Sequence, residues 1–325
     1  MNRKKCAVFS APGLGDGLIA LMLAHNLSLN GFDPIIYHPN QLWDLQSLYP
    51  HLPIAPFPST EDASCLLSSY DKIFLSFDGN SKLILELIRQ GKDSFSEKIY
   101  VMNPSPSKKK KDPSSYDDVG FSSSLNMVEN TAFFCAHKLG FAKSTKDSGL
   151  ILPPAFKVRK ESRQIIIHPT CGRQGRSWPS EKFVKLALHL QKERWDPVFV
   201  MNKNEVALWP ALVHKEIPSY LFSNLLELAF FVAQAGYMIG NDSGIGHLAS
   251  ALGLPTVTIC RHYRIAKIWR PGWGLNEVVF PLRWIPNFHA FRLRDRHWKK
   301  FLAVQKVVNS FQKLLEKEKL GSVVK

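Results

Sequence analysis

The stretch 236–260, GYMIGNDSGIGHLASALGLPTVTIC, constrains the fold most, because it reads as strand, tight turn, helix and strand without a gap. Asp242 and Ser243 are suited to cap the helix, and Gly253 and Pro255 are suited to end it. A glycine-lined turn at a helix N-terminus leaves amide N–H groups unpaired, which favours a bound phosphate. Spacing alone is equally consistent with an ordinary strand-to-helix connection in which the glycines serve packing.

The same alternation of strand and helix runs through the rest of the chain, which predicts mainly parallel sheets with helices on their faces. The stretch 143–163 has no periodic run and contains two adjacent prolines, so we place a boundary there. The prediction is an α/β protein with domains 1–155 and 156–325. A last amphipathic helix, about 296–319, is expected to pack back on the first domain.

Positive charge is concentrated in the second half of the chain. Residues 1–150 hold 15 Lys and Arg against 15 Asp and Glu, whereas residues 151–325 hold 27 against 12. The segment 261–300 has ten basic and two acidic residues, interleaved with tryptophans. Such a surface suits nucleic acid, anionic lipid headgroups or a phosphorylated glycolipid, and it is also typical of a solvated basic face. The lysine run 108–111 is expected to lie in an exposed loop.

The five cysteines show no metal-binding or disulfide spacing, which indicates a reducing cytoplasm and neither a metal site nor a disulfide framework. Pro12, two glycines and Asp16 interrupt the apolar N-terminal stretch, so it is a poor signal peptide. No apolar run reaches the roughly 20 residues of a membrane helix. We therefore expect a cytoplasmic protein.

Two further glycine loops carry residues with chemistry. Asp16 lies in the loop PGLGDG after the first predicted strand, where a carboxylate can act as a general base or simply cap the next helix. Arg173 and Arg176 lie in the loop after the strand at 163–168, and either guanidinium can neutralise a diphosphate. His247, one turn into the central helix, either orients the turn or packs as a satisfied histidine.

Three motifs resemble glycosyltransferase family 9, the ADP-heptose:lipopolysaccharide heptosyltransferases. They are the loop SAPGLGDGLIAL at 10–21, the segment HPTCGRQGRSWPSEKF at 168–183, and the run from Asp242 through His247 to Pro255. They occur in the family's order and cover most of the chain. The resemblance implies a GT-B fold, with two Rossmann-like domains facing a central cleft, the acceptor on the first and the nucleotide-sugar donor on the second.

The resemblance also implies roles for single residues. Asp16 would be the general base, with Gly15 and Gly17 beside the acceptor. The donor would be held by Arg173, Arg176, Asp242, Ser243, Gly244 and His247, with the diphosphate on Arg176 and on the amides of Ser243 and Gly244. The implied reaction is an inverting transfer of heptose from ADP-heptose to a lipid-anchored lipopolysaccharide core, without metal or cofactor. The partners expected are this donor, this acceptor and the anionic inner face of the inner membrane, and no nucleic acid.

Two positions depart from the family pattern. Arg176 stands where lysine is frequent, and the segment RHYRIAKIWRPGWG follows the strand at 256–260 where a glycine and a small polar turn are usual. This places Arg261, His262 and Arg264 at the donor edge. The alternatives are therefore a GT-B glycosyltransferase with another nucleotide sugar, and a noncatalytic binder of phosphorylated glycolipid.

Overall fold

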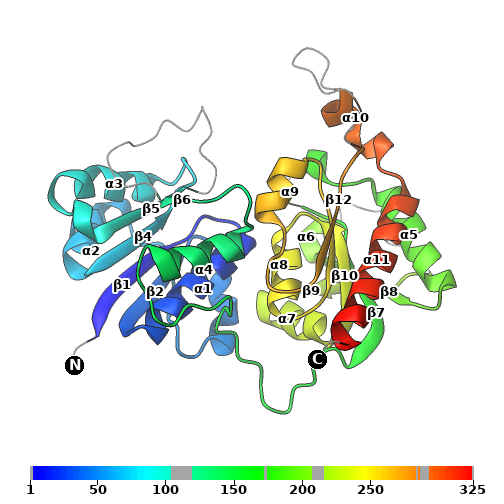
Figure 1. The fold of residues 1–325 in the computed structure, drawn as a ribbon, viewed down its shortest axis with the longest axis horizontal. Coiled ribbons are helices and arrows are strands. Elements are labelled where there is room, and N and C mark those ends of the chain that lie inside the picture. Colours follow the sequence, from blue (N-terminus) through cyan, green and yellow to red (C-terminus); the bar gives the residue numbers. More distant parts are fainter. Residues whose placement is uncertain are drawn as a thin grey trace. The chain divides into compact units, whose positions relative to one another are not determined.

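A computed structural model describes residues 3–103, 119–171, 174–206, 216–282, 285 and 293–323. The chain divides into two compact units, Met1–Pro153 and Pro154–Lys325. Each unit contains one six-stranded sheet in which every pair of neighbouring strands is parallel, with helices on both faces (Figure 1). The predicted α/β fold class is confirmed. The lysine run 108–111 and Arg173 lie outside the described residues.

The first unit has the strand order β3-β2-β1-β4-β5-β6. Its strands are β1 (Lys4–Phe9), β2 (Phe32–His38), β3 (Ile54–Pro56), β4 (Lys72–Ser76), β5 (Ile99–Asn103) and β6 (Val119–Gly120). Its helices are α1 (Leu14–Leu29), α2 (Ala63–Ser69), α3 (Lys82–Ser94) and α4 (Met127–His137), with short 3-10 turns between them. The helix α1 is the first element after β1. Its apolar positions are buried, and it contacts the sheet and α4.

The second unit has the strand order β12-β11-β10-β7-β8-β9. Its strands are β7 (Glu161–His168), β8 (Asp196–Asn202), β9 (Ser219–Phe222), β10 (Ala235–Asn241), β11 (Thr256–Ile259) and β12 (Asn276–Val279). Its helices are α5 (Ser180–Lys192), α6 (Lys203–Val206), α7 (Leu225–Gln234), α8 (Gly244–Ala251), α9 (Tyr263–Trp269), α10 (Leu293–Phe301) and α11 (Val304–Val323). The stretch 236–260 is therefore β10, α8 and β11, as the sequence predicts.

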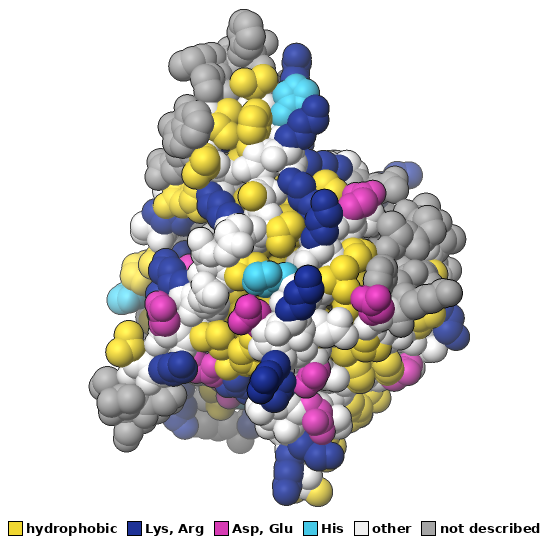
Figure 2. All heavy atoms as spheres, turned by 90° about the vertical axis from the view of Figure 1, so that its right-hand side faces the viewer, with side chains coloured by type: hydrophobic (Ala, Val, Ile, Leu, Met, Phe, Trp, Pro, Cys, Tyr) yellow, Lys and Arg dark blue, Asp and Glu magenta, His cyan; other side chains and the backbone are white. Residues whose placement is uncertain are grey.

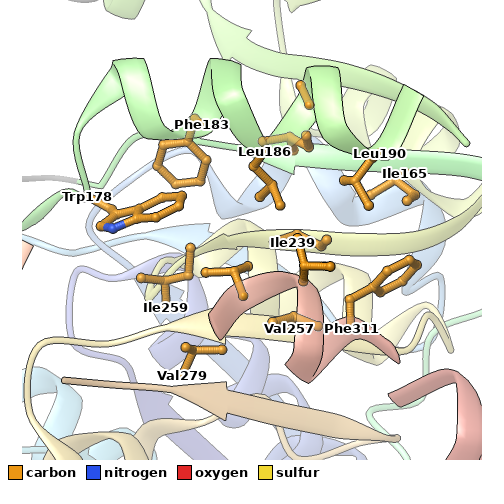
Figure 3. Packing of buried hydrophobic residues seen from close by; sticks show 14 of the residues in the cluster. Ile165, Trp178, Phe183, Leu186, Leu190, Ile239, Val257, Ile259, Val279 and Phe311 are labelled. Carbon is orange, nitrogen blue, oxygen red and sulfur yellow. The ribbon is translucent and has the colours of Figure 1, made fainter. Parts of the chain in front are cut away.

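One face of the second sheet forms a core with α5 and α11. Figure 3 shows Phe183, Leu186 and Leu190 pointing from α5 toward the sheet, and Phe311 entering the same layer from α11. Trp178, just before α5, is fully buried in this core. The apolar face of α11 is thus used within the second unit, and its predicted packing on the first unit stays a prediction.

The predicted helix 296–319 is two helices, so this prediction is wrong in detail. The helix α10 ends at Phe301 and α11 begins at Val304. Polar side chains donate hydrogen bonds to the backbone carbonyl groups at this break. Trp178 Nε1 donates to Leu302 O at 3.1 Å, and Lys182 Nζ donates to Lys299 O at 2.6 Å and to Leu302 O at 2.7 Å. These tertiary hydrogen bonds replace the intrahelical ones, which ends α10. Within the described ranges, no helix has the length and apolar content that crossing a membrane requires.

Candidate active site

Three strand ends of the second sheet meet at one edge. The strand β10 lies between β7 and β11, and all three are parallel. Asn241 of β10 pairs with Ile259 of β11, and Gly240 pairs with His168 of β7. The chain therefore leaves the three strands side by side at their carboxyl ends, where open α/β sheets bind ligands.

Asn241 joins two of these strand ends. This buried side chain accepts a hydrogen bond from Trp178 N at 3.0 Å through Oδ1, and Nδ2 donates to Pro169 O. Both ends of the loop after β7 are thereby fixed beside the turn after β10. Asn241 is not among the residues predicted from the sequence, although a polar residue at the end of an apolar strand was a signal for it.

The 242–244 turn precedes a helix N-terminus that has no side-chain cap. Asp242 N donates to Ile259 O at 3.0 Å, which holds the turn against β11. Ser243 is the N-cap residue of α8 in an extended conformation, and its side chain does not cap the helix. Its Oγ atom is buried without a hydrogen-bond partner among the described residues. A helix N-terminus without a side-chain cap and a buried hydroxyl beside it favour the phosphate seat over the ordinary connection.

Gly240 allows the backbones of β10 and β7 to approach each other below this turn. A Cβ atom at residue 240 would lie 2.6 Å from His168 O, which is closer than real Cβ contacts. The glycine is therefore required by the close strand approach.

Arg176 interacts electrostatically with the carboxyl group of Asp242 at this edge of the sheet. Burial raises the pKa of the Asp242 carboxyl to about 6, and the nearby Arg176 opposes this rise. Arg176 ends a short 3-10 turn, Gln174–Arg176, and is exposed. The structure thus brings together Arg176, Asp242, Ser243 and Gly244 from two different loops.

His247 is buried inside the unit. Burial lowers the pKa of its imidazole to about 4, although a hydrogen bond with the Trp269 backbone opposes this shift. The ring also meets the indole of Trp273 edge to face, at 6.2 Å between centroids. This neutral ring packs α8 against the segment after α9. Its Nδ1 atom is buried without a hydrogen-bond partner among the described residues, so the ring is not a fully satisfied packing histidine, and a direct donor contact of His247 stays a prediction.

Arg261 and His262 follow β11 at the same edge. His262 Nδ1 lies 3.3 Å from Asp295 Oδ1 of α10. Burial lowers the pKa of His262; Asp295 opposes the shift, and Arg261, Arg294 and Arg176 add to it. Several cations therefore crowd the strand ends around one neutral imidazole. The side chain of Arg264, named with these two residues, is not among those described.

A second polar group lies at the ends of β7 and β8. Thr170 Oγ1 donates to Glu205 Oε1 at 2.6 Å and lies 3.1 Å from His168 Nε2. His168 Nδ1 lies 2.9 Å from Val200 O, and burial lowers the pKa of this imidazole. These residues are not among those predicted from the sequence, because Thr170 and Glu205 are far apart in the chain and are brought together by the pairing of β7 with β8.

In the first unit, residues at and just after the end of β2 contact the loop that precedes α1. Asn40 Nδ2 donates to Pro12 O at 2.6 Å, and His38 Nε2 lies 3.3 Å from Gly13 O. Asp16 lies in the first turn of α1, partly buried, and a Cβ atom at Gly13 would collide with its carboxylate. This position is compatible with both alternatives, the helix cap and the general base.

Gly15 and Gly17 are buried in the first turn of α1. A Cβ atom at residue 17 would lie 3.0 Å from the side chains of His38 and Leu42. Tight packing thus accounts for Gly17, and a role of either glycine at the acceptor stays a prediction.

Solved glycosyltransferases have a similar fold over nearly the whole chain. The E. coli ADP-heptose LPS heptosyltransferase II has a TM-score of 0.66 at 16% identity, with 97% of this chain and 99% of that chain covered. The family 9 glycosyl transferase from Veillonella parvula has a TM-score of 0.70 at 13% identity, with 98% of both chains covered. The E. coli heptosyltransferase WaaC, in a structure with ADP, has a TM-score of 0.64 at 13% identity, with 95% and 99% covered. The fold is therefore that of the GT-B glycosyltransferases.

The family follows from the sequence match. Residues 118–280 match the model of glycosyltransferase family 9 (heptosyltransferase), and this match spans half of the chain. It includes Arg176, Asn241 and the 242–244 turn. The chain belongs to glycosyltransferase family 9, which confirms the predicted resemblance. Among curated proteins, none matches the sequence significantly.

Proposed function

We propose that this protein is an inverting glycosyltransferase that transfers a heptose from ADP-heptose to a lipopolysaccharide core acceptor, without a metal ion. The observation that supports the proposal is the 242–244 turn in a family 9 protein: the N-terminus of α8 has no side-chain cap, Ser243 Oγ has no partner among the described residues, and Arg176 is close enough to act on Asp242. Structures of E. coli heptosyltransferase WaaC with ADP and with ADP-2-deoxy-2-fluoro heptose support the donor class.

In this proposal the second unit binds the donor. Arg176 and the first amides of α8 hold the diphosphate and stabilise the negative charge that builds on the leaving ADP. Ser243 Oγ donates a further hydrogen bond to a phosphate oxygen. Asp242 accepts hydrogen bonds from hydroxyl groups of the donor sugar, and Arg173 is assigned to the same side.

The first unit supplies the base. An acceptor hydroxyl attacks the anomeric carbon of the donor sugar while the bond from that carbon to the diphosphate oxygen breaks. Asp16 takes the hydroxyl proton, and ADP leaves with the electron pair of the broken bond. A single displacement of this kind inverts the anomeric configuration. Gly15 and Gly17 are assigned to the acceptor beside Asp16.

The acceptor proposed is lipid-anchored, so the protein is expected to work peripherally at the inner face of the inner membrane. Lys and Arg side chains gather over α10 and the start of α5 on the face shown in Figure 2. Within α10, Arg296 and Lys300 are exposed and Lys299 is partly exposed. Such a surface is attracted to anionic headgroups.

The test is thermal stabilisation by a panel of nucleotides and nucleotide sugars, since a ligand that binds only the native state raises Tm. ADP and ADP-heptose are expected to raise Tm of the wild type and not of Arg176→Ala. A larger rise in Tm with UDP or GDP would leave the glycosyltransferase activity in place and would change the proposed donor. No response to any nucleotide, together with tight binding of an anionic glycolipid, would overturn the enzyme in favour of a binding protein.

A further inference from the structure

The strand order places one arginine on each side of the 242–244 turn. The turn follows β10, the loop with Arg176 follows β7 on one side, and Arg261 follows β11 on the other. Asp242 N donates to Ile259 O at 3.0 Å, and Asn241 Oδ1 accepts from Trp178 N at 3.0 Å, so both neighbours are fixed to β10. Arg176 and Arg261 therefore follow the two strands on either side of β10, which leads into α8.

Arg261 has a donor that no described residue satisfies. Its Nε atom is buried and has no hydrogen-bond partner among the described residues. The backbone before it is fixed, because Cys260 N donates to Val279 O at 2.8 Å. A buried N–H group without an acceptor is unfavourable, and such groups need an explanation. Ser243 Oγ, in the turn itself, is a second buried donor without a partner in the described part of the chain.

An anionic ligand at this edge would offer an acceptor to both groups, which have none among the described residues. A diphosphate within a nucleotide sugar carries two negative charges on two neighbouring phosphoryl groups. Two guanidinium groups on opposite sides of a helix N-terminus match this arrangement, because each can bind phosphate oxygens with its fork of N–H donors.

We propose that Arg261 is a second diphosphate-binding residue, which takes one phosphoryl group of a nucleoside diphosphate while Arg176 takes the other. This inference rests on the proposed function, since it assumes that the 242–244 turn holds a donor diphosphate. It adds a residue outside the motifs that carry the family resemblance. The next residue, His262, lies with Nδ1 3.3 Å from Asp295 Oδ1 of α10.

The cations around His262 give the proposal a second readout. Burial and the positive charges of Arg261, Arg294 and Arg176 keep the pKa of this imidazole low, and Asp295 is the acidic group that faces it. A diphosphate bound between Arg261 and Arg176 would offset part of that positive charge and raise the pKa again. Binding below neutral pH is then expected to take up a proton.

The experiment is calorimetric titration of the wild type and of Arg261→Gln with inorganic pyrophosphate, ADP and AMP. Loss of a charged hydrogen-bond donor is expected to weaken ADP and pyrophosphate by about 10- to 100-fold, and AMP by much less. Arg261→Lys keeps the positive charge but loses the forked pair of N–H donors. Its affinity for ADP and pyrophosphate should therefore lie between those of the wild type and Arg261→Gln. Arg163→Gln is the matched control: Arg163 pairs with Asp196 at 3.9 Å near the opposite end of β7, so its affinity should not change.

The outcomes separate this inference from the proposed function. If Arg261→Gln and Arg261→Lys both bind ADP as tightly as the wild type while Arg176→Gln binds weakly, the second arginine is refuted and the donor site stands. If the wild type binds neither ADP nor pyrophosphate, the proposed function fails and this inference with it. Titrations in buffers of different ionisation enthalpy at pH 6 should show proton uptake in the wild type, and its absence would contradict the arrangement around His262.

Discussion

At the scale of single residues, Asp242 is a charged group held where its charge is unfavourable. Its pKa of about 6 lies above the ordinary value of about 4, because burial disfavours the carboxylate. In the described part of the chain, the backbone N–H of Asp242 donates to Ile259 O, and Arg176 is the cation that partly offsets the burial of its carboxylate. A residue kept at a cost to stability is typical of a ligand site.

Asp242→Asn should therefore stabilise the protein at alkaline pH. The raised pKa in the folded state means that the favourable contribution of Asp242 is complete below about pH 4 and is lost as the pH rises through about 6. Asparagine avoids that loss, so the free energy of unfolding at pH 8 should rise by about 1–2 kcal/mol, allowing for residual solvent contact. Chemical denaturation at pH 8 and pH 4 measures it. Equal stability of variant and wild type at pH 8 would contradict the buried charge.

Asp16 has two possible roles, and one substitution separates them. If Asp16 is the base, Asp16→Asn should lower kcat by about 100- to 10,000-fold and leave the Kd for ADP unchanged. If it only caps α1, kcat should persist in Asp16→Asn, because asparagine caps about as well as aspartate, and Asp16→Ala should lower the free energy of unfolding by up to about 2 kcal/mol. Single-turnover kinetics together with chemical denaturation distinguish the two results.

At the scale of elements, local sequence patterns predicted the helices and strands that depend on nearby residues. They did not predict features that depend on contacts between distant parts of the chain. The strand, turn and helix at 236–260 follow from glycines, cap residues and apolar spacing, all of which are local. The break between α10 and α11 was missed, because Trp178 and Lys182, more than a hundred residues earlier in the chain, end α10. Asn241 was missed for the same reason, since its partners come from the loop after β7.

Asn241→Ala tests how strongly the two loops depend on this connection. The substitution leaves Trp178 N and Pro169 O without their side-chain partner in the interior, which should lower the free energy of unfolding by about 1–3 kcal/mol. ADP affinity should also fall, because the loop of Arg176 is no longer fixed beside the turn. Asn309→Ala, on the exposed side of α11, is the control and should change neither quantity. Unchanged ADP affinity in Asn241→Ala would show that the loop is positioned by other contacts.

At the scale of the whole molecule, the charge of +15 is unevenly distributed along the chain. Residues 1–150 are balanced, and the excess belongs to the second half, where basic side chains gather over α10 and α5 (Figure 2). This asymmetry was visible in the sequence. The side chains that share one surface were not, because α5 and α10 meet only in the tertiary structure, where Lys182 Nζ donates to Lys299 O and Trp298 packs in the same core as Phe183.

The membrane proposal predicts that α10 contributes to binding of anionic vesicles. Replacing Arg296, Lys299 and Lys300 together by Glu should weaken binding to phosphatidylglycerol vesicles by about 1 kcal/mol or more per residue, and added salt should shrink the difference. The control reverses three exposed lysines elsewhere, Lys138, Lys143 and Lys157. Vesicle sedimentation measures both variants. Equal losses in the two triple variants would indicate a net-charge effect and refute a specific role of α10.

The central claim is that the protein moves a sugar from a nucleotide donor to an acceptor through the 242–244 turn and Asp16. The most direct measurement incubates the wild type, Arg176→Ala and Asp16→Asn with ADP-heptose and a heptose-free lipopolysaccharide core, and follows the acceptor by mass spectrometry. The account predicts that the wild type adds one heptosyl residue and releases one ADP, and that both variants are strongly impaired. An acceptor mass that stays unchanged with every nucleotide sugar tested, while ADP still binds, would contradict it.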